Sequence, residues 1–461
     1  MSPFLPWKIV NVELREPLPD LAAEAATGGL FVMFWCQGVP VGQLLMPASL
    51  LPLSSAQLAA SAAQRVARAV GHGLMKNGYP APPFFLSPNA EPGPGLAQVL
   101  EIAQPLESFS RLADLGDIRD FEVTTPSVTV IICTRNRPEA LRNCLSSLRF
   151  LSRQPHEVIV VDNDPSSHFT APVVAEFPGI RYVPEPRPGL SAARNTGVRN
   201  STCEIIAFTD DDVTVHPAWT AAILRGFADP KIMALTGAVL PAELATDAQF
   251  AFQNEAFAWE LGFEGYEALD FDSNFFRNTM HLGVPVWRMG AGANMAFRRE
   301  AFDRVGLFDE RLGAGTSGCS EDSELWYRLL AEGYQCRYDP GAVVSHFHRS
   351  DWEELSYQTY SYMRGHVAAL LFQFDRYKHW GNVRRAFLIL PLYFTKLTFR
   401  ALIQRLARLL VNSDQDQPSL VSPLYQKIRG MLAGYAYYLR SRHLPADPMG
   451  TAVSENNNGR E

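Results

Sequence analysis

Three adjacent aspartates, Asp210, Asp211 and Asp212, end the apolar segment "EIIAFTDDDVTV" at residues 204–215. Ionised carboxylates repel one another and are costly to hold near a core, so this cluster calls for an explanation. In a strand, Asp210 and Asp212 point to one side and Asp211 to the other, as a spacer. Two carboxylates on one side form a hard oxygen site that suits Mg²⁺ or Mn²⁺. A solvated acidic turn that caps the following helix explains the triplet as well.

A second acidic pair, Glu321 and Asp322, stands at the start of "SEDSELWYRLLAEGY", a predicted amphipathic helix at residues 320–334. A carboxylate held there can act as a general base toward a hydroxyl. The helix dipole favours acidic residues in a first turn whatever the function, which is the competing explanation. The preceding "GAGTSG" at 313–318 has dinucleotide-binding spacing but neither a buried strand before it nor a neutral helix start after it. We therefore interpret it as a loop that lets the carboxylates approach a substrate.

Basic and imidazole groups complete the set of candidate residues. Arg194 lies in the predicted helix "GLSAARNTG", and Arg135 and Arg137 follow an apolar strand. Each of these arginines can offset phosphate charge, and each is also explained as a surface arginine. His346 and His348 end another strand-like run, "VVSHFHRS", where one imidazole can ligate a metal.

The elements that must position these groups alternate between strand and helix from about residue 127. The continuous β-branched run "VTVIICT" at 128–134 is typical of a parallel strand buried on both faces. The succession that follows predicts an α/β fold with a doubly wound sheet, in which ligands bind outside the carboxyl ends of the strands. Thr134, Asp162 and Asp210 all fall at such ends, so we expect them to converge on one site.

Seven blocks, in this order, resemble a family 2 glycosyltransferase with the GT-A fold. They span about residues 128–349, roughly half of the chain. The blocks are "VTVIICTRNRPEALRNCLSSL", "EVIVVDND", "RPGLSAARNTGV", "IIAFTDDDV", "GAGANMAFRREAFDRVGLFDERLGAGT", "SEDSELWYRLLAEGYQCRYDP" and "VSHFHR". The resemblance implies a nucleotide-diphosphate sugar donor, a divalent cation (Mg²⁺ or Mn²⁺) and inversion at the anomeric carbon.

The resemblance also implies roles for residues on the donor side. Thr134 and Asp162 match positions that contact the nucleotide base, and Arg194 matches an arginine that assists base or phosphate binding. Asp210 matches the first residue of a D-x-D pair, near the ribose. The predicted donor-binding residues are Thr134, Arg135, Asp162, Arg194, Asp210 and Asp211.

For the metal and the chemistry, Asp212 matches the metal-binding residue of the same pair, with Asp210 beside it. His346 aligns with a position that ligates the metal in some relatives. Asp322 matches the proposed catalytic base, and Glu321 is its partner in the pair. The function implied is transfer of the sugar to an acceptor hydroxyl, in the synthesis of a polysaccharide, glycolipid or other glycoconjugate.

Two other functions remain to be compared with this one. A nucleotide-sugar-binding scaffold or regulator without transfer activity would carry the same binding residues. A nucleotidyltransferase would share the α/β architecture and the metal. It should show a phosphate loop rich in glycine and lysine after the first strand, which "CTRNRPEAL" does not offer.

The 461 residues divide by composition into five regions. We expect a small N-terminal α+β domain of unknown role at 1–76 and a Pro/Gly-rich linker with a helix at 77–125. The catalytic domain is expected at 126–350 and a helical extension, a candidate for membrane-surface contact, at 351–450. The tail at 451–461 is expected to be disordered.

Charge and cysteine usage limit the partners and the compartment. A net charge of −7 argues against a nucleic-acid partner. Six scattered cysteines without a CxxC pair, and no signal peptide, indicate the cytoplasm. No uncharged apolar run has the length of a spanning helix. Residues 376–410 hold eight Lys or Arg and no Asp or Glu. A basic amphipathic helix there would suit peripheral contact with the inner membrane face and a lipid-linked acceptor, and packing on the catalytic domain explains it as well.

Overall fold

The computed structural model describes residues 4–76, 126–254, 266–411 and 421–449. The expected linker at 77–125 and tail at 451–461 lie outside these ranges.

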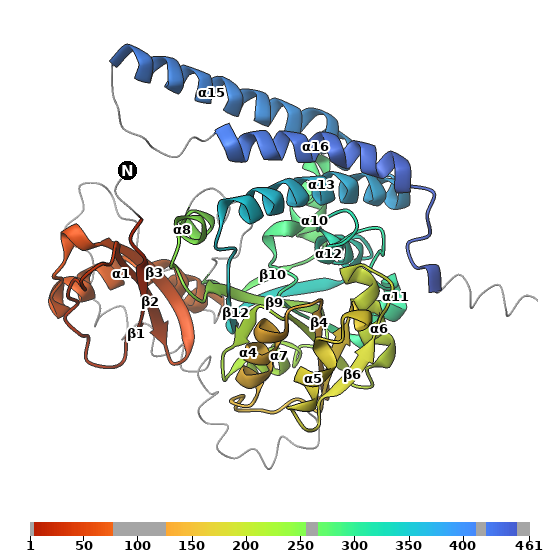
Figure 1. Ribbon diagram of the computed structural model, residues 1–461, viewed down its shortest axis with the longest axis horizontal. Coiled ribbons are helices and arrows are strands. Elements are labelled where there is room, and N and C mark those ends of the chain that lie inside the picture. The colour runs from red at the N-terminus through yellow and green to blue at the C-terminus, as the bar shows by residue number, and fades with distance from the viewer. Residues whose placement is uncertain (1–3, 77–125, 255–265, 412–420, 450–461) are drawn as a thin grey trace, which may run out of the picture.

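A mixed nine-stranded sheet forms the centre of the catalytic region (Figure 1). Its strands are β4 (Val128–Thr134), β5 (Glu157–Asp162), β6 (Arg181–Pro184), β7 (Ile205–Asp210), β8 (Val213–Val215), β9 (Ile232–Pro241), β10 (Leu269–Phe271), β11 (Asn294–Arg298) and β12 (Gln335–His346). The order in space is β10-β12-β9-β11-β7-β4-β5-β6, with β8 paired to β12. Neighbours among β4, β5, β6 and β7 are parallel, whereas β11 is antiparallel to β7 and β9. The predicted α/β class is confirmed.

Helices cover both faces of this sheet. They are α4 (Pro138–Leu148), α5 (Thr170–Ala175), α6 (Leu190–Asn200), α7 (Trp219–Gly226), α8 (Asp247–Asn254), α10 (Ser273–Thr279), α11 (Arg299–Val305) and α12 (Glu321–Ala331). Val130 and Ile132 of β4 pack in a core cluster with α4 and α7, and Ile131 packs in another with α6 and α12. A Cβ on Gly197 would lie 2.6 Å from Ile131 Cγ2. Glycine therefore lets α6 lie close to β4, which brings Arg194, one turn earlier, to the edge of the sheet where the site forms.

The N-terminal region packs against the edge of this sheet. It contains β1 (Trp7–Glu13), β2 (Gly29–Cys36), β3 (Val39–Pro47) and α1 (Ser55–Lys76). Strands β2 and β3 form a hairpin, and its turn residues Gln37 and Gly38 both have positive φ. Phe31 and Met33 of β2 cluster with Val343 of β12, while the other face of β2 packs on α1.

The C-terminal helices lie over the catalytic domain (Figure 1). They are α13 (Trp352–Tyr377), α14 (Trp380–Arg384), a π-helical turn (Arg385–Ile389), α15 (Leu390–Val411) and α16 (Val421–Ser441). The helix continues through Pro391. Proline cannot donate an N–H to the carbonyl four residues earlier, and the backbone widens into the π-turn just before it.

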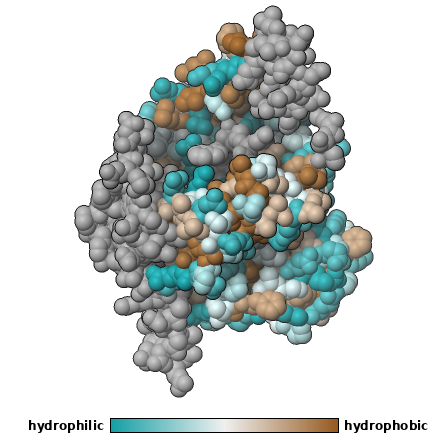
Figure 2. Space-filling model, turned by 90° about the vertical axis from the view of Figure 1, so that its left-hand side faces the viewer, coloured by the Kyte–Doolittle hydropathy of each residue, from teal (hydrophilic) through white to brown (hydrophobic). Residues whose placement is uncertain are grey.

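The expectation that no segment can span a membrane also needs correction. The helix Trp380–Ile403 is long and apolar enough to cross one, by length and composition only. It escaped a search for uncharged runs because Lys396 and Arg400 lie within it. Only 17% of its most apolar window is buried, and Phe399 is 62% exposed. Figure 2 shows apolar side chains among polar ones at the top of the molecule, the height at which α15 lies in Figure 1.

Candidate active site

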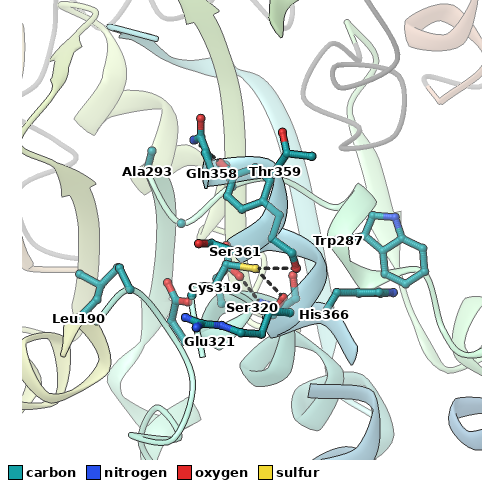
Figure 3. Close-up of a pocket in the computed structure, with 18 of the residues that line it drawn as sticks. Leu190, Trp287, Ala293, Cys319, Ser320, Glu321, Gln358, Thr359, Ser361 and His366 are labelled. Carbon is teal, nitrogen blue, oxygen red and sulfur yellow. Dashed lines mark hydrogen bonds between the residues drawn. The ribbon is translucent and has the colours of Figure 1, made fainter. Parts of the chain in front are cut away.

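A cavity of about 1110 Å³ runs from the carboxyl ends of β4 and β7 to the C-terminal helices. Figure 3 shows Leu190 and Trp287 on opposite sides of it, with His366 beside Trp287. The predicted site residues that line it are Thr134, Arg135, Arg194, Asp210, Asp211, Asp212, Glu321, Asp322 and His346.

The aspartate triplet forms a turn, not a continuous strand. β7 ends at Asp210, so the expected alternation of side chains does not extend over the next two residues. Asp211 is buried in the same cavity as its neighbours, where it accepts hydrogen bonds from Thr134 Oγ1 (2.7 Å) and Arg137 Nη1 (3.0 Å). It is a structural part of the site, not a spacer. No aspartate caps α7, whose N-cap is Ala218.

Asp212 is held between cationic groups. Its Oδ2 lies 3.0 Å from Arg137 Nη1 and 3.6 Å from Arg349 Nη2, and its Oδ1 lies 3.3 Å from His346 Nε2. Burial opposes ionisation of Asp212, but His346 and the two arginines lower its pKa below the ordinary value. The carboxylate is therefore charged at neutral pH.

His346 is oriented by a chain of partners behind it. Its Nδ1 lies 3.0 Å from Nδ1 of the buried His348, whose Nε2 lies 3.0 Å from Gln253 Oε1. Pairing of β12 with β8 places His346 opposite Val213, the residue after the triplet. A metal-binding imidazole is commonly fixed in this way through its other nitrogen.

The residues around Asp212 fit a divalent cation that is completed by substrate oxygens. Asp212 Oδ1 and His346 Nε2 face each other across 3.3 Å, and Asp210 lines the same cavity. Among the described residues, no group of three or more His, Cys, Asp and Glu forms a complete metal site. Mg²⁺ is commonly held by one or two carboxylates, with phosphate oxygens and water as further ligands.

Arg194 joins the aspartate turn to α12. It is almost fully buried, with Nη1 at 2.5 Å from Glu321 Oε1 and Nη2 at 3.4 Å from Asp210 Oδ1. Burial raises the pKa of Glu321 to about 7, against the lowering effect of Arg194. Glu321 Oε2 has no hydrogen-bond partner among the described residues, so this carboxyl can hold a proton near neutrality.

Asp322 lies in the first turn of α12 and faces the cavity. Its Oδ1 accepts a hydrogen bond from the backbone N–H of Ser323 at 2.6 Å. Burial raises its pKa above the ordinary value, opposed by Arg194. A Cβ on Gly292 would lie 2.8 Å from Arg194 Nη2 and 3.2 Å from Asp322 Oδ2, so glycine is needed there. The arrangement places a half-buried carboxylate of raised pKa in the same cavity as the ionised Asp212.

Asp162 is the predicted site residue that the structure keeps out of the cavity lining. It is fully buried, and its oxygens accept hydrogen bonds from Tyr182 Oη (2.9 Å) and the backbone N–H of Asp164 (3.1 Å). The next residue, Asn163, lines the cavity instead and accepts a hydrogen bond from the N–H of Gly189. Asp162 is the last residue of β5, and Asn163 is the first residue after it.

The "GAGTSG" loop borders the cavity, as expected, and α13 holds it in place. Gly313, Gly315 and Gly318 all have positive φ, which explains the glycine spacing without a nucleotide. Arg364 donates to the carbonyls of Ser317 (2.6 Å) and Thr316 (2.9 Å).

Sequence reasoning missed the residues at the far end of the cavity, which come from the turn at 286–288 and from the C-terminal helices. Trp287, His366, Arg385 and Lys427 line the far end of the cavity, on four different elements. Their separation along the chain leaves no spacing signal. Arg349, nearer the aspartates, stands inside the quoted block "VSHFHR", which could have pointed to it.

The central part of the chain is similar to proteins of a known family. Residues 129–306 match Glycosyl transferase family 2. The chain is 31% identical over 234 residues to the pre-mycofactocin glycosyltransferase of Mycobacterium tuberculosis, covering 49% of this chain and 44% of that protein. It is 28% identical over 255 residues to the chondroitin synthase of Escherichia coli, covering 50% and 36%. The chain thus spans less than half the length of these relatives.

Among solved structures, a mannosyltransferase from Pyrobaculum calidifontis in complex with GDP-Man and Mn²⁺ shares 18% identity. The match covers 68% of this chain and 88% of that one, with a TM-score of 0.44, which is too low to transfer a ligand. The family resemblance noted in the sequence is confirmed over residues 129–306.

Proposed function

We propose that this chain, whose residues 129–306 match Glycosyl transferase family 2, is a metal-dependent inverting glycosyltransferase. It would move a sugar from a nucleotide-diphosphate sugar to an acceptor hydroxyl in the synthesis of a glycoconjugate. The observation that carries the proposal is that Asp322, Arg194 and Asp212 line one cavity. A base and a metal-binding carboxylate are groups that such a displacement uses, and Arg194 joins the elements that carry them.

In the reaction, Asp322 accepts the proton of the acceptor hydroxyl. The hydroxyl oxygen bonds to the anomeric carbon while the bond from that carbon to the diphosphate oxygen breaks, and the electron pair leaves with the nucleoside diphosphate. One displacement inverts the anomeric centre, so a second nucleophile is not needed. Arg194 fixes Glu321 beside Asp322 and keeps α12 against the aspartate turn.

On the donor side, we assign the cation to Asp212, with Asp210 and His346 beside it. Bound Mg²⁺ or Mn²⁺ supplies compensation for the charge that develops on the leaving diphosphate. Arg137 and Arg349 add positive charge next to Asp212. Thr134, Asn163 and Arg135 border the region where the nucleoside would lie.

A screen of nucleotide sugars by thermal shift, with and without Mn²⁺, tests the proposal. The true donor should raise the melting temperature only with the cation, because ligands that bind the native state stabilise it. Transfer of the sugar is then measured with that donor. A donor that binds without any transfer or hydrolysis would favour the scaffold, and no binding by any donor would refute both functions.

The acceptor is a carbohydrate or a lipid-linked sugar, and the enzyme acts in the cytoplasm with peripheral contact at the inner membrane face. Phe387, Leu392 and Phe399 are each more than half exposed along the helix that also carries Lys396 and Arg400. The helix start cannot enter the hydrocarbon, because Ala386, Leu390 and Phe394 pack in a cluster with α13 and α16. Surface contact is therefore favoured over spanning. Sedimentation with anionic but not with neutral vesicles is expected, and no sedimentation with either would refute this contact.

A further inference from the structure

The helical end of the cavity differs in charge from the end that carries the aspartates. Among the described residues from 351 onward and the turn at 286–288, the lining includes four cationic side chains and one acidic side chain, Glu354. The cationic residues are Arg288, Arg364, Arg385 and Lys427. A cavity wall with excess positive charge attracts anions. This end therefore suits a negatively charged group, whereas the aspartate end needs a cation first.

Arg385 is fixed in place at this end. Its guanidinium carbon lies 4.1 Å from the centroid of the Trp287 ring, and its Nε lies 3.4 Å from His366 Nε2. His366 itself packs edge-on against Trp287 at 4.7 Å. Burial, and then the charge of Arg385, lowers the pKa of His366 to about 3, so the neutral ring accepts the arginine N–H. An arginine held by stacking in this way is a typical phosphate-binding group.

Apolar residues continue the cavity beyond Arg385 along the same helix. Ile389 and Leu390 line it, followed by Tyr393 and Phe394 one turn later. Lys427, 8% exposed on α16, lines it from the opposite helix. The helix then continues into the exposed apolar face of α15. Positive charge therefore gives way to an apolar path that leads toward the surface.

We propose that this end of the cavity binds the phosphate group of a lipid-linked acceptor. Arg385 and Lys427 contact the phosphate, the hydrocarbon chain lies along Tyr393 and Phe394, and the acceptor sugar extends toward Asp322. The placement of the acceptor sugar near Asp322 rests on the proposed function, whereas binding of the lipid phosphate does not.

Binding of dodecyl phosphate to the full chain, measured by calorimetry below its critical micelle concentration, tests the proposal. Dodecanol and inorganic phosphate serve as the two partial ligands. Dodecyl phosphate should bind at least about tenfold more tightly than either, because it offers both the charge and the chain. Equal binding of inorganic phosphate would indicate a phosphate site without a lipid, and equal binding of dodecanol an apolar site without an anion. Either result overturns the proposal.

Matched variants locate the site. Arg385→Gln and Lys427→Gln should each weaken dodecyl phosphate binding by about tenfold or more, since each removes a charge-assisted hydrogen bond. Arg384→Gln makes the same change at an exposed neighbour that does not line the cavity, and should leave binding unchanged. An equal loss of dodecyl phosphate binding in the Arg384→Gln protein would indicate general charge attraction. It would overturn the placement of the phosphate at Arg385 and Lys427. If the Arg385→Gln protein does not fold, the Lys427→Gln protein provides the test. Unchanged binding of dodecyl phosphate by the Lys427→Gln protein would refute the proposal.

A separate measurement distinguishes this inference from the proposed function. Nucleoside diphosphate binding with Mn²⁺ tests the donor end, and Asp212→Asn should abolish it while dodecyl phosphate still binds. Loss of dodecyl phosphate binding in the Lys427→Gln protein, with nucleotide binding retained, supports the helical site alone. Nucleotide binding without any dodecyl phosphate binding by the unaltered protein refutes the helical site and leaves the proposed function standing.

Discussion

The two ends of the cavity are held together by different kinds of interaction. At the aspartate end, Thr134 ends β4 and Asp211 follows the neighbouring strand β7, and their side chains are hydrogen-bonded at 2.7 Å. Backbone ladders set the positions of these residues. At the helical end, α13, the π-turn and α16 meet by side-chain packing, as in the cluster of Val367, Ala386 and Met431. Backbone pairing of the strands thus fixes the residues of the aspartate end, whereas the residues of the helical end are positioned by the packing of helices.

The ends also handle charge in opposite ways. Arg194 and Arg137 compensate carboxylates at the aspartate end, which leaves a site that gains a diphosphate only together with a cation. Among the described residues, the helical end is lined by more cationic than acidic side chains. A donor diphosphate at the aspartate end and an acceptor phosphate at the helical end would match this separation. Substitutions at the two ends should therefore weaken the binding of different ligands.

The largest effect is expected from removing the proposed base. Asp322→Asn should lower the transfer rate by about 10²–10⁴-fold while donor binding persists, because only proton transfer is lost. Glu353→Gln, in the exposed first turn of α13, is the matched control and should retain full activity. Donor binding is followed by thermal shift and transfer by product formation. Full transfer by the Asp322→Asn protein would remove this residue from the mechanism.

A change in the helix packing should affect the helical end alone. A Cβ on Gly430 of α16 would lie 2.4 Å from the carbonyl oxygen of Tyr360 and 2.9 Å from Met363 Cβ. Gly430→Ala should therefore lower the free energy of unfolding by about 1–3 kcal/mol, since this crowding exceeds the gain of about 1 kcal/mol in helix propensity. Chemical denaturation measures the change.

The same Gly430→Ala protein should bind dodecyl phosphate more weakly and the donor normally. Ala436→Val adds volume at an exposed position of the same helix and should change neither. Equal loss of donor binding in Gly430→Ala would show that the two ends do not respond separately.

Sequence patterns predicted the aspartate end well, and the reason is local. Buried strands and polar tips are short segments, so Thr134 and Asp210 could be placed at one edge of the sheet before the structure was seen, and the family resemblance added Arg194. Asp162 was misplaced because the strand ends one residue before the side chain that lines the cavity. The role of Asp211 was misjudged because alternation stops where the strand becomes a turn. The helical end depends on contacts between Trp287, His366, Arg385 and Lys427, and no pattern within a single segment records such packing.

The smallest expected effect, a shift in pH dependence, distinguishes the two carboxylates of α12. Burial raises the pKa of Asp322, so protonation removes the base as the pH falls through a value above that of an ordinary aspartate, about 3.9. The apparent pKa of the acid limb of kcat/KM should therefore be higher than that of an ordinary aspartate. Glu321→Gln should keep the limb with little shift, because a carboxyl whose pKa is about 7 already holds its proton at more acid pH, and glutamine is likewise neutral. Loss of the limb in Glu321→Gln would instead assign the base to Glu321. The helical end should not contribute through His366, whose pKa of about 3 keeps it neutral.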